Sequence, residues 1–187
     1  MEAMGIIFSN IYDNNMGELT RERTSASIPF GSRYRQIDFA LSNMANSKIS
    51  NIGIVTKYNY QSLMDHLGNC EEWDLKLGEG VRFLPPYATG HTGAYRGKLE
   101  ALQTAMPVLS RCDAEYVVLS DTTVLCAINF AAVLMSTSPP AAILQLLPRR
   151  AAPTARPVSR WPSSSETTVR SSIWLLTTAR RRIIWSA

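Results

Sequence analysis

Residues 28–47 read I-P-F-G-S-R-Y-R-Q-I-D-F-A-L-S-N-M-A-N-S, and the fold can be worked out from this stretch. Its second half repeats apolar side chains at helical spacing, which predicts a helix over residues 36–47. An apolar run over residues 4–9 precedes it, and a β-branched apolar run over residues 51–56 follows it. A strand, a helix and a second strand in this order are typical of a parallel sheet joined by crossover helices.

The same alternation continues along the chain. We expect helices over residues 60–67 and 99–109, strands over residues 81–84 and 115–120, and a further helix that opens at Asn129. Ligands of such α/β sheets sit beyond the carboxyl ends of the strands. The rule selects two places: residues 10–27, expected to form a surface loop after the first strand, and Asp121, directly after the strand at 115–120.

Composition changes abruptly at Leu134. Residues 1–134 carry 11 Lys and Arg against 14 Asp and Glu, whereas residues 135–187 carry 8 Arg and a single acid. The overall net charge of +4 therefore belongs to the tail, and the mildly acidic body gives no sign of nucleic-acid binding. No stretch is long and apolar enough to span a membrane.

Three cysteines lie far apart without metal-ligand spacing. They are typical of reduced thiols, and they favour a cytoplasmic protein.

Three segments resemble those of bacterial glucose-1-phosphate adenylyltransferases, also called ADP-glucose pyrophosphorylases. Residues 28–47 are close to the family pattern P-F-G-G-x-Y-R-x-I-D-F-x-L-S-N-x-x-N-S, and the similarity continues through residues 52–67 and 95–102. The resemblance implies an α/β, Rossmann-like nucleotidyltransferase domain. Residues 4–134 would be its N-terminal part, and the family's C-terminal β-helix would be missing. It also implies Mg²⁺ as cofactor in a reaction that joins ATP and glucose 1-phosphate, with release of pyrophosphate.

The phosphate-binding segments depart from this pattern. Where the family carries G-G-x-G-x-R-L, residues 9–19 read S-N-I-Y-D-N-N-M-G-E-L, so Gly17 is the one glycine kept. The family's R-A-K-P is replaced by R-T-S-A at residues 23–26, without the lysine. Backbone amides at glycines and cationic side chains are what a triphosphate needs. Gly17 and Arg23 are therefore the nucleotide-binding candidates of this region.

Two further segments carry the remaining candidates. Residues 95–102 read Y-R-G-K-L-E-A-L where the family has Y-x-G-T-A-D-A-V, which makes Gly97 and Glu100 candidates for nucleotide or sugar binding. Glu100 could equally be a first-turn acid favoured by the helix dipole. Residues 119–125 read L-S-D-T-T-V-L where the family has L-S-G-D-H-I-Y. Asp121 is thus the candidate Mg²⁺ ligand, unless it only caps a helix or solvates a loop.

These departures lie in the segments that would bind phosphate groups. In this respect the sequence resembles the catalytically degenerate D-type glycogen-biosynthesis subunit. The resemblance implies a regulatory, non-catalytic subunit without a confident catalytic residue, of which this chain would be a fragment that is inactive alone. The intact parent would support a catalytic glucose-1-phosphate adenylyltransferase subunit and could bind ATP or ADP-glucose-type ligands. One alternative is a catalytic nucleotidyltransferase with a divergent phosphate loop. Another is a nucleic-acid- or membrane-associated protein that acts through its Arg-rich tail.

The tail itself is predicted to be off-frame. A family member would continue with a helix such as D-E-H-V-A, and the codons of that peptide, read one base out, give M-S-T-S-P, which is the sequence of residues 135–139. We therefore expect residues 135–187 to be an aberrant, low-complexity and poorly ordered segment with one weak helical candidate over residues 172–179. Because the later strands of the family's sheet would be absent, we expect the sheet to be left with an unpaired edge.

Overall fold

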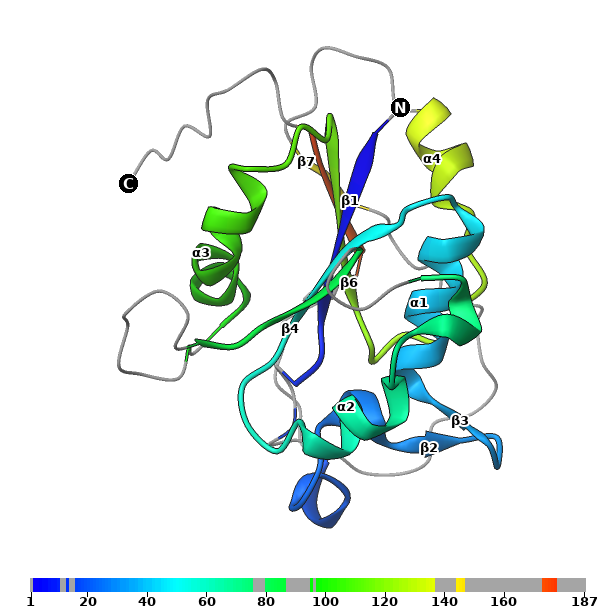
Figure 1. Cartoon of the computed structure of the whole chain (residues 1–187), viewed down its shortest axis with the longest axis vertical. Coiled ribbons are helices and arrows are strands. Elements are labelled where there is room, and N and C mark those ends of the chain that lie inside the picture. Colours follow the sequence, from blue (N-terminus) through cyan, green and yellow to red (C-terminus); the bar gives the residue numbers. More distant parts are fainter. Residues whose placement is uncertain are drawn as a thin grey trace, which may run out of the picture.

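The protein is represented by a computed structural model, which describes residues 2–10, 13, 16–75, 80–86, 95, 97–136, 144–146 and 173–177. A six-stranded sheet in the order β5-β4-β1-β6-β8-β7 runs through it (Figure 1). Its parallel strands are β1 (Ala3–Phe8), β4 (Asn51–Val55), β5 (Val81–Leu84) and β6 (Tyr116–Asp121). The predicted parallel α/β fold is confirmed.

The strand order reverses beside β1. The chain passes from β1 to β4 and β5 on one side and then returns to the other side of β1 with β6. Phe8, the last residue of β1, pairs with Asp121, the last residue of β6, so both strands end at the same level. Such a switch point is where open α/β sheets bind their ligands.

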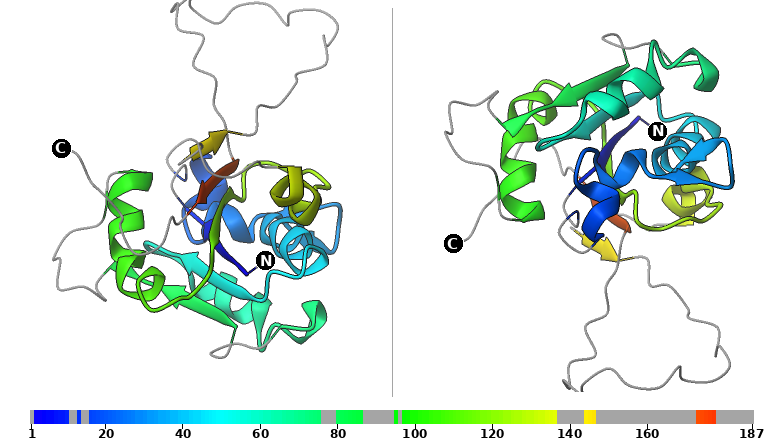
Figure 2. Two further views of the ribbon diagram at one scale, coloured as in Figure 1. Left: turned by 90° about the horizontal axis from the view of Figure 1, so that it is seen from above. Right: turned by 90° about the horizontal axis from the view of Figure 1, so that it is seen from below.

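Helices cover both faces of the sheet (Figures 1 and 2). One face is covered by α1 (Gln36–Asn46), α2 (Gln61–Leu67) and α4 (Phe130–Ser136), and the other by α3 (Lys98–Leu109). Each side forms its own apolar core, because strands buried on both faces send alternate side chains to opposite layers. The helices expected over 36–47, 60–67 and 99–109 are thereby confirmed within a residue or two.

Residues 28–47 connect several elements of the fold through hydrogen bonds. They form a short hairpin, β2 (Pro29–Phe30) with β3 (Tyr34–Arg35), and then α1. The Asp38 carboxylate accepts a hydrogen bond from the backbone N–H of Arg35 at 2.8 Å, and its other oxygen lies 2.6 Å from His66 Nε2. Asn43 donates to the carbonyl of Cys126 and accepts from the N–H of Ile128. These bonds tie α1 to α2 and to the segment before α4.

Glycine leaves room for neighbouring side chains at one central position of the sheet. A Cβ added at Gly53 in β4 would lie 2.7 Å from Leu84 Cδ1 and 2.9 Å from Ile6 Cδ1. Carbon atoms do not approach this closely without displacement, so a side chain here would force the ends of the Leu84 and Ile6 side chains to shift.

The segment after β1 differs in part from the expected surface loop. Its first half, which includes the 3-10 helix η2 (Gly17–Thr20), exposes Glu18 and Leu19 as expected. Its second half, which includes the 3-10 helix η3 (Ser25–Ser27), is buried. The carbonyl of Ser9 accepts two hydrogen bonds from this half. The Ser25 hydroxyl donates one at 3.0 Å, and the backbone N–H of Ala26 donates the other at 3.1 Å. A surface location was wrong for this half because its small residues pack under the end of β1.

Two expectations about the tail are also wrong. The segment expected as a weak helix over residues 172–179 contains a strand, β8 (Ile173–Thr177), which pairs antiparallel with β6. A second strand, β7 (Leu144–Leu146), pairs with β8, so the edge of β6 is not left open. The sequence I-W-L-L-T combines β-branched, aromatic and aliphatic residues, and an open strand edge offers it hydrogen-bond partners.

The domain boundary at residue 134 stays a prediction. Helix α4 continues across it to Ser136, and most of residues 137–187 lie outside the described residues. Among the residues that the structure describes, no helix is long and apolar enough to cross a membrane.

Candidate functional site

Polar side chains gather where the parallel strands end, and we call this group the strand-end cluster. It comprises Ser9, Asn10 and Asp13 after β1, Thr56, Lys57 and Tyr58 after β4, Tyr95 and Lys98 around the start of α3, and Asp121 and Thr122 at the end of β6. Most of these side chains are buried, which is unusual for polar groups unless a specific interaction keeps them.

An ion pair in the cluster joins Lys98 to Asp121. Lys98 Nζ lies 2.5 Å from Asp121 Oδ2, and the side chains of Lys98 and Asp121 are 23% and 3% exposed. The other oxygen, Asp121 Oδ1, is buried and accepts no hydrogen bond from the described residues. Burial raises the pKa of Asp121, and the ammonium of Lys98 acts against that rise. The ammonium also lies 5.9 Å from the centre of the Phe8 ring, so it spans the seam between β1 and β6.

A second buried carboxylate, Asp13, lies in the segment after β1. One oxygen accepts the backbone N–H of Ser25 at 2.9 Å, and the other has no partner among the described residues. Burial raises the pKa of Asp13, against opposing effects of the bonds with Ser25 and the charge of Lys57. The Lys57 ammonium lies 5.4 Å from the ring centre of Tyr58 and 5.8 Å from that of Tyr95. Burial and the nearby Asp13 charge raise the pKa of both tyrosines.

Two adjoining pockets lie along the segment after β1. The larger, of about 280 Å³, is lined by Asp13, Gly17, Glu18, Thr20, Arg21, Tyr58 and Asn59. The smaller, of about 180 Å³, is lined by Glu18, Leu19, Arg21, Glu22 and Arg23.

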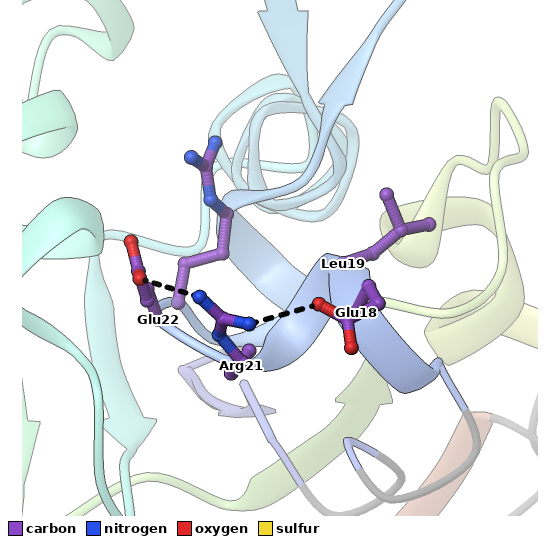
Figure 3. A pocket seen from close by; sticks show the side chains of 5 residues that line it. Glu18, Leu19, Arg21 and Glu22 are labelled. Carbon is purple, nitrogen blue, oxygen red and sulfur yellow. Dashed lines mark hydrogen bonds and ion pairs between the residues drawn. The ribbon is translucent and has the colours of Figure 1, made fainter.

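Two carboxylates form ion pairs with Arg21, one of the two arginines that line these pockets. Figure 3 shows Arg21 between Glu18 and Glu22, at 3.3 and 3.5 Å. All three side chains are well exposed, so each ion pair stabilises the fold little. Their effect on a ligand is larger, because the smaller pocket presents the carboxylates of Glu18 and Glu22 together with two guanidinium groups, those of Arg21 and Arg23. A triphosphate would be repelled by the first and attracted by the second.

The candidate residues from the sequence fall into two groups. Gly17, with a φ of +55°, lines the larger pocket, and the half-buried Arg23 lines the smaller one. Gly97 is the N-cap of α3, directly before Lys98, which reaches Asp121. Glu100 is an exposed acid in the first turn of α3, and its role in binding stays a prediction.

Mg²⁺, implied by the resemblance, does not fit the arrangement at Asp121. One oxygen of Asp121, Oδ2, is already bonded to the Lys98 ammonium, so any metal ion at this carboxylate would lie close to a positive charge. A divalent ion about 4 Å from an ammonium would be repelled by roughly 8 kcal/mol at an effective dielectric constant of about 20. Among the described residues, no group of three His, Cys, Asp or Glu side chains could hold a metal ion.

Sequence reasoning missed Lys98, Lys57 and the buried state of Asp13. A signal for Lys98 was present, because a lysine stands where the quoted family pattern has threonine. The fact that its ammonium meets Asp121, 23 residues further along, follows only from the crossover of α3 to β6.

Comparisons with known proteins place these features in a family. Residues 14–152 match the family described as "Nucleotidyl transferase". The chain is 37% identical over 134 residues to the glycogen biosynthesis protein GlgD of Bacillus subtilis, which covers 71% of this chain and 39% of that protein. It is 36% identical over 120 residues to a glucose-1-phosphate adenylyltransferase of Clostridium perfringens, which covers 63% of this chain and 31% of that protein. The chain thus spans less than two-fifths of the length of these relatives.

A solved structure supports the fold. A crystal structure from Bacillus anthracis, described as a glucose-1-phosphate thymidylyltransferase, aligns with a TM-score of 0.62 at 16% identity. The alignment covers 94% of this chain and 71% of that one. The sheet order, the strand-end cluster and the family match over residues 14–152 lead to one conclusion: this chain belongs to the nucleotidyl transferase family.

Proposed function

We propose that the protein acts in glycogen biosynthesis as a non-catalytic, regulatory subunit of the GlgD type. In this role it would associate with a catalytic glucose-1-phosphate adenylyltransferase subunit, which joins ATP and glucose 1-phosphate to ADP-glucose and pyrophosphate. The names of its relatives support the pathway. A cytoplasmic location belongs to the same proposal, which the free thiols of Cys70, Cys112 and Cys126 favour.

One observation carries the non-catalytic part of the proposal. The pockets after β1 present Glu18 and Glu22 to Arg21, in the segment where the resemblance would put a glycine-rich cradle for a triphosphate. Catalysis of adenylyl transfer relies on donors and cations that stabilise the charge developing on the leaving pyrophosphate. Carboxylates at this place disfavour that charge.

Pyrophosphate release tests the proposal directly. The full chain is incubated with ATP, glucose 1-phosphate and Mg²⁺, alone and with the Clostridium perfringens adenylyltransferase, and release is followed by a coupled assay. We expect no release by the chain alone, and we expect the chain to co-elute with the adenylyltransferase and to change its rate. Magnesium-dependent turnover by the chain alone would instead favour a catalytic transferase with a divergent phosphate loop.

The variant Glu18→Gln/Glu22→Gln tests the observation behind the proposal. Removing both carboxylates frees Arg21 and lowers the repulsion of an anion, so the affinity for ATP, measured by calorimetry in EDTA, should rise several-fold. Glu71→Gln/Glu72→Gln, in the 3-10 helix η4 (Glu71–Trp73), is the matched control with the same change in net charge. Equal effects of the two double variants would show that the pocket carboxylates do not matter.

A further inference from the structure

The ammonium of Lys98 stands where a cation would meet the carboxylate at the end of β6. We propose that Lys98 is a built-in cation that replaces a divalent metal at Asp121 and keeps this position closed to metal ions. Ligands that reach the strand-end cluster would accordingly bind without a metal. The inference rests on the proposed function in one respect, which is that this site does not catalyse metal-dependent nucleotidyl transfer.

The fold fixes the lysine in this place. Lys98 is the first residue of α3 and follows Gly97, whose backbone is extended. Asp121 is the last residue of β6, next to Phe8 at the end of β1. The ammonium bonds to Asp121 Oδ2 at 2.5 Å and lies over the Phe8 ring. Both side chains are largely buried, so the contact is shielded from water and salt.

The charges of Lys98 and Asp121 cancel, and this cancellation determines whether the site can bind a divalent cation. A divalent cation is attracted by carboxylates whose charge is not already neutralised, and it needs several oxygen ligands. Asp121 offers one oxygen to Lys98, while its other oxygen, Oδ1, is buried without a partner among the described residues. If the ammonium were removed, two oxygens of a buried, uncompensated carboxylate would remain at the strand end. Such a group either takes up a proton or attracts a cation.

Lys98→Thr is the informative substitution. Threonine is shorter than lysine, adds a hydroxyl oxygen, and is the residue in the family pattern quoted for this position. The change removes the ammonium and opens space beside Asp121 at the same time. Lys98 is therefore the residue that determines whether the strand end admits a divalent ion.

Calorimetric titration with Mn²⁺ in the absence of nucleotide tests the inference. The unchanged chain should show no Mn²⁺ binding that depends on Asp121. Lys98→Thr should bind Mn²⁺ at least ten-fold more tightly than the unchanged chain does. The double variant Lys98→Thr/Asp121→Asn should lose that gain. Lys57→Thr is the control, because it removes a lysine of the same cluster whose ammonium faces Tyr58 and Tyr95 instead of Asp121.

Two results would overturn the inference. One is Asp121-dependent Mn²⁺ binding by the unchanged chain, and the other is a Lys98→Thr protein that gains no Asp121-dependent binding. If Lys98→Thr fails to fold, refolding in the presence and absence of Mn²⁺ decides the matter, since the inference expects the metal to restore folding. A protein that stays unfolded with the metal contradicts it.

Pyrophosphate release separates this inference from the proposed function. A chain that binds Mn²⁺ at Asp121 but produces no pyrophosphate would refute the inference alone. A chain that produces pyrophosphate without Mn²⁺ binding at Asp121 would refute the proposed function alone.

Discussion

Replacing Lys98 by methionine should destabilise the protein and make its stability depend more strongly on pH. Methionine keeps the unbranched shape of the lysine stem but removes the charge that compensates Asp121. The Asp121 side chain is 3% exposed, so water cannot take over the lost interaction. Removing one partner of a buried ion pair typically costs about 3–5 kcal/mol. Because Lys98 is 23% exposed, we expect a loss of about 2–3 kcal/mol near pH 7.

The direction of the pH dependence follows from the pKa of Asp121. Burial already raises this pKa above its value in the unfolded chain, and loss of Lys98 raises it further. A carboxyl with a raised pKa stabilises the fold below its unfolded pKa, and this stabilisation is lost as the pH rises through the folded pKa. The loss caused by Lys98→Met should therefore be small near pH 4 and should grow towards pH 7, by about 1.4 kcal/mol for each unit of additional pKa shift.

Urea unfolding followed by tryptophan fluorescence provides the measurement. Lys98→Met, Asp121→Asn and the double variant form a double-mutant cycle, with the exposed Lys48→Met as the control that should change stability by less than about 0.5 kcal/mol. The double variant leaves no unpaired buried charge, so it should be more stable than the sum of the single losses predicts, by at least about 1.5 kcal/mol. Additive losses within about 0.5 kcal/mol, or a loss from Lys98→Met that does not change with pH, would refute the reasoning.

Four further predictions concern the scaffold and the tail. Asn43→Ala should cost about 2 kcal/mol and speed proteolysis before α4, because it removes the bonds to Cys126 and Ile128; the exposed Asn46→Ala should not do so. Gly53→Ala should cost about 1–3 kcal/mol in urea unfolding, whereas Gly97→Ala, whose Cβ would meet nothing within 4 Å, should cost less than about 0.5 kcal/mol. Deleting residues 137–187 removes β7 and β8, so β6 should exchange its amide hydrogens faster and the protein should aggregate; unchanged deuterium uptake over residues 116–121 would contradict the pairing. Sequencing the DNA around codon 134 should reveal a family-like continuation in a shifted frame, and no such continuation means that the tail is encoded as it stands.

Much of the parallel part of the fold could be predicted from the sequence, because its signals are local. The apolar run before Asn10, the helical spacing after Gln36 and the β-branched run at residues 51–56 each specify one element. Strands buried on both faces leave continuous apolar runs, which are easy to recognise. The places of the first three elements in the sheet then follow from the preference for right-handed, un-knotted crossovers.

The antiparallel part of the sheet could not be predicted in this way. The apolar run around Ile173 is too short for its spacing to distinguish a strand from a helix. Their state depends on an unpaired strand edge, β6, which lies more than fifty residues earlier in the chain. Partners this distant in sequence leave no local pattern.

The site shows the same division. Asp121 was found because it follows a clear strand, and the ends of strands gather at one edge of a parallel sheet. Its partner, Lys98, was not found, because the first residue of a helix can be directed at a strand end only once the position of that helix is known. The burial of residues 24–27 was also missed, since small polar residues are as common in packed turns as in exposed loops.

Paramagnetic broadening by Mn²⁺ tests most directly the claim that Lys98 occupies the cation position at Asp121. Nuclear magnetic resonance spectra of the isotope-labelled chain would be recorded during a Mn²⁺ titration, with the backbone amides of Asp121 and Thr122 as reporters. Our account predicts that these two signals keep their intensity in the unchanged chain and are lost at low Mn²⁺ concentration in Lys98→Thr. Loss of both signals in the unchanged chain, at the same Mn²⁺ concentration as in the variant, would contradict it.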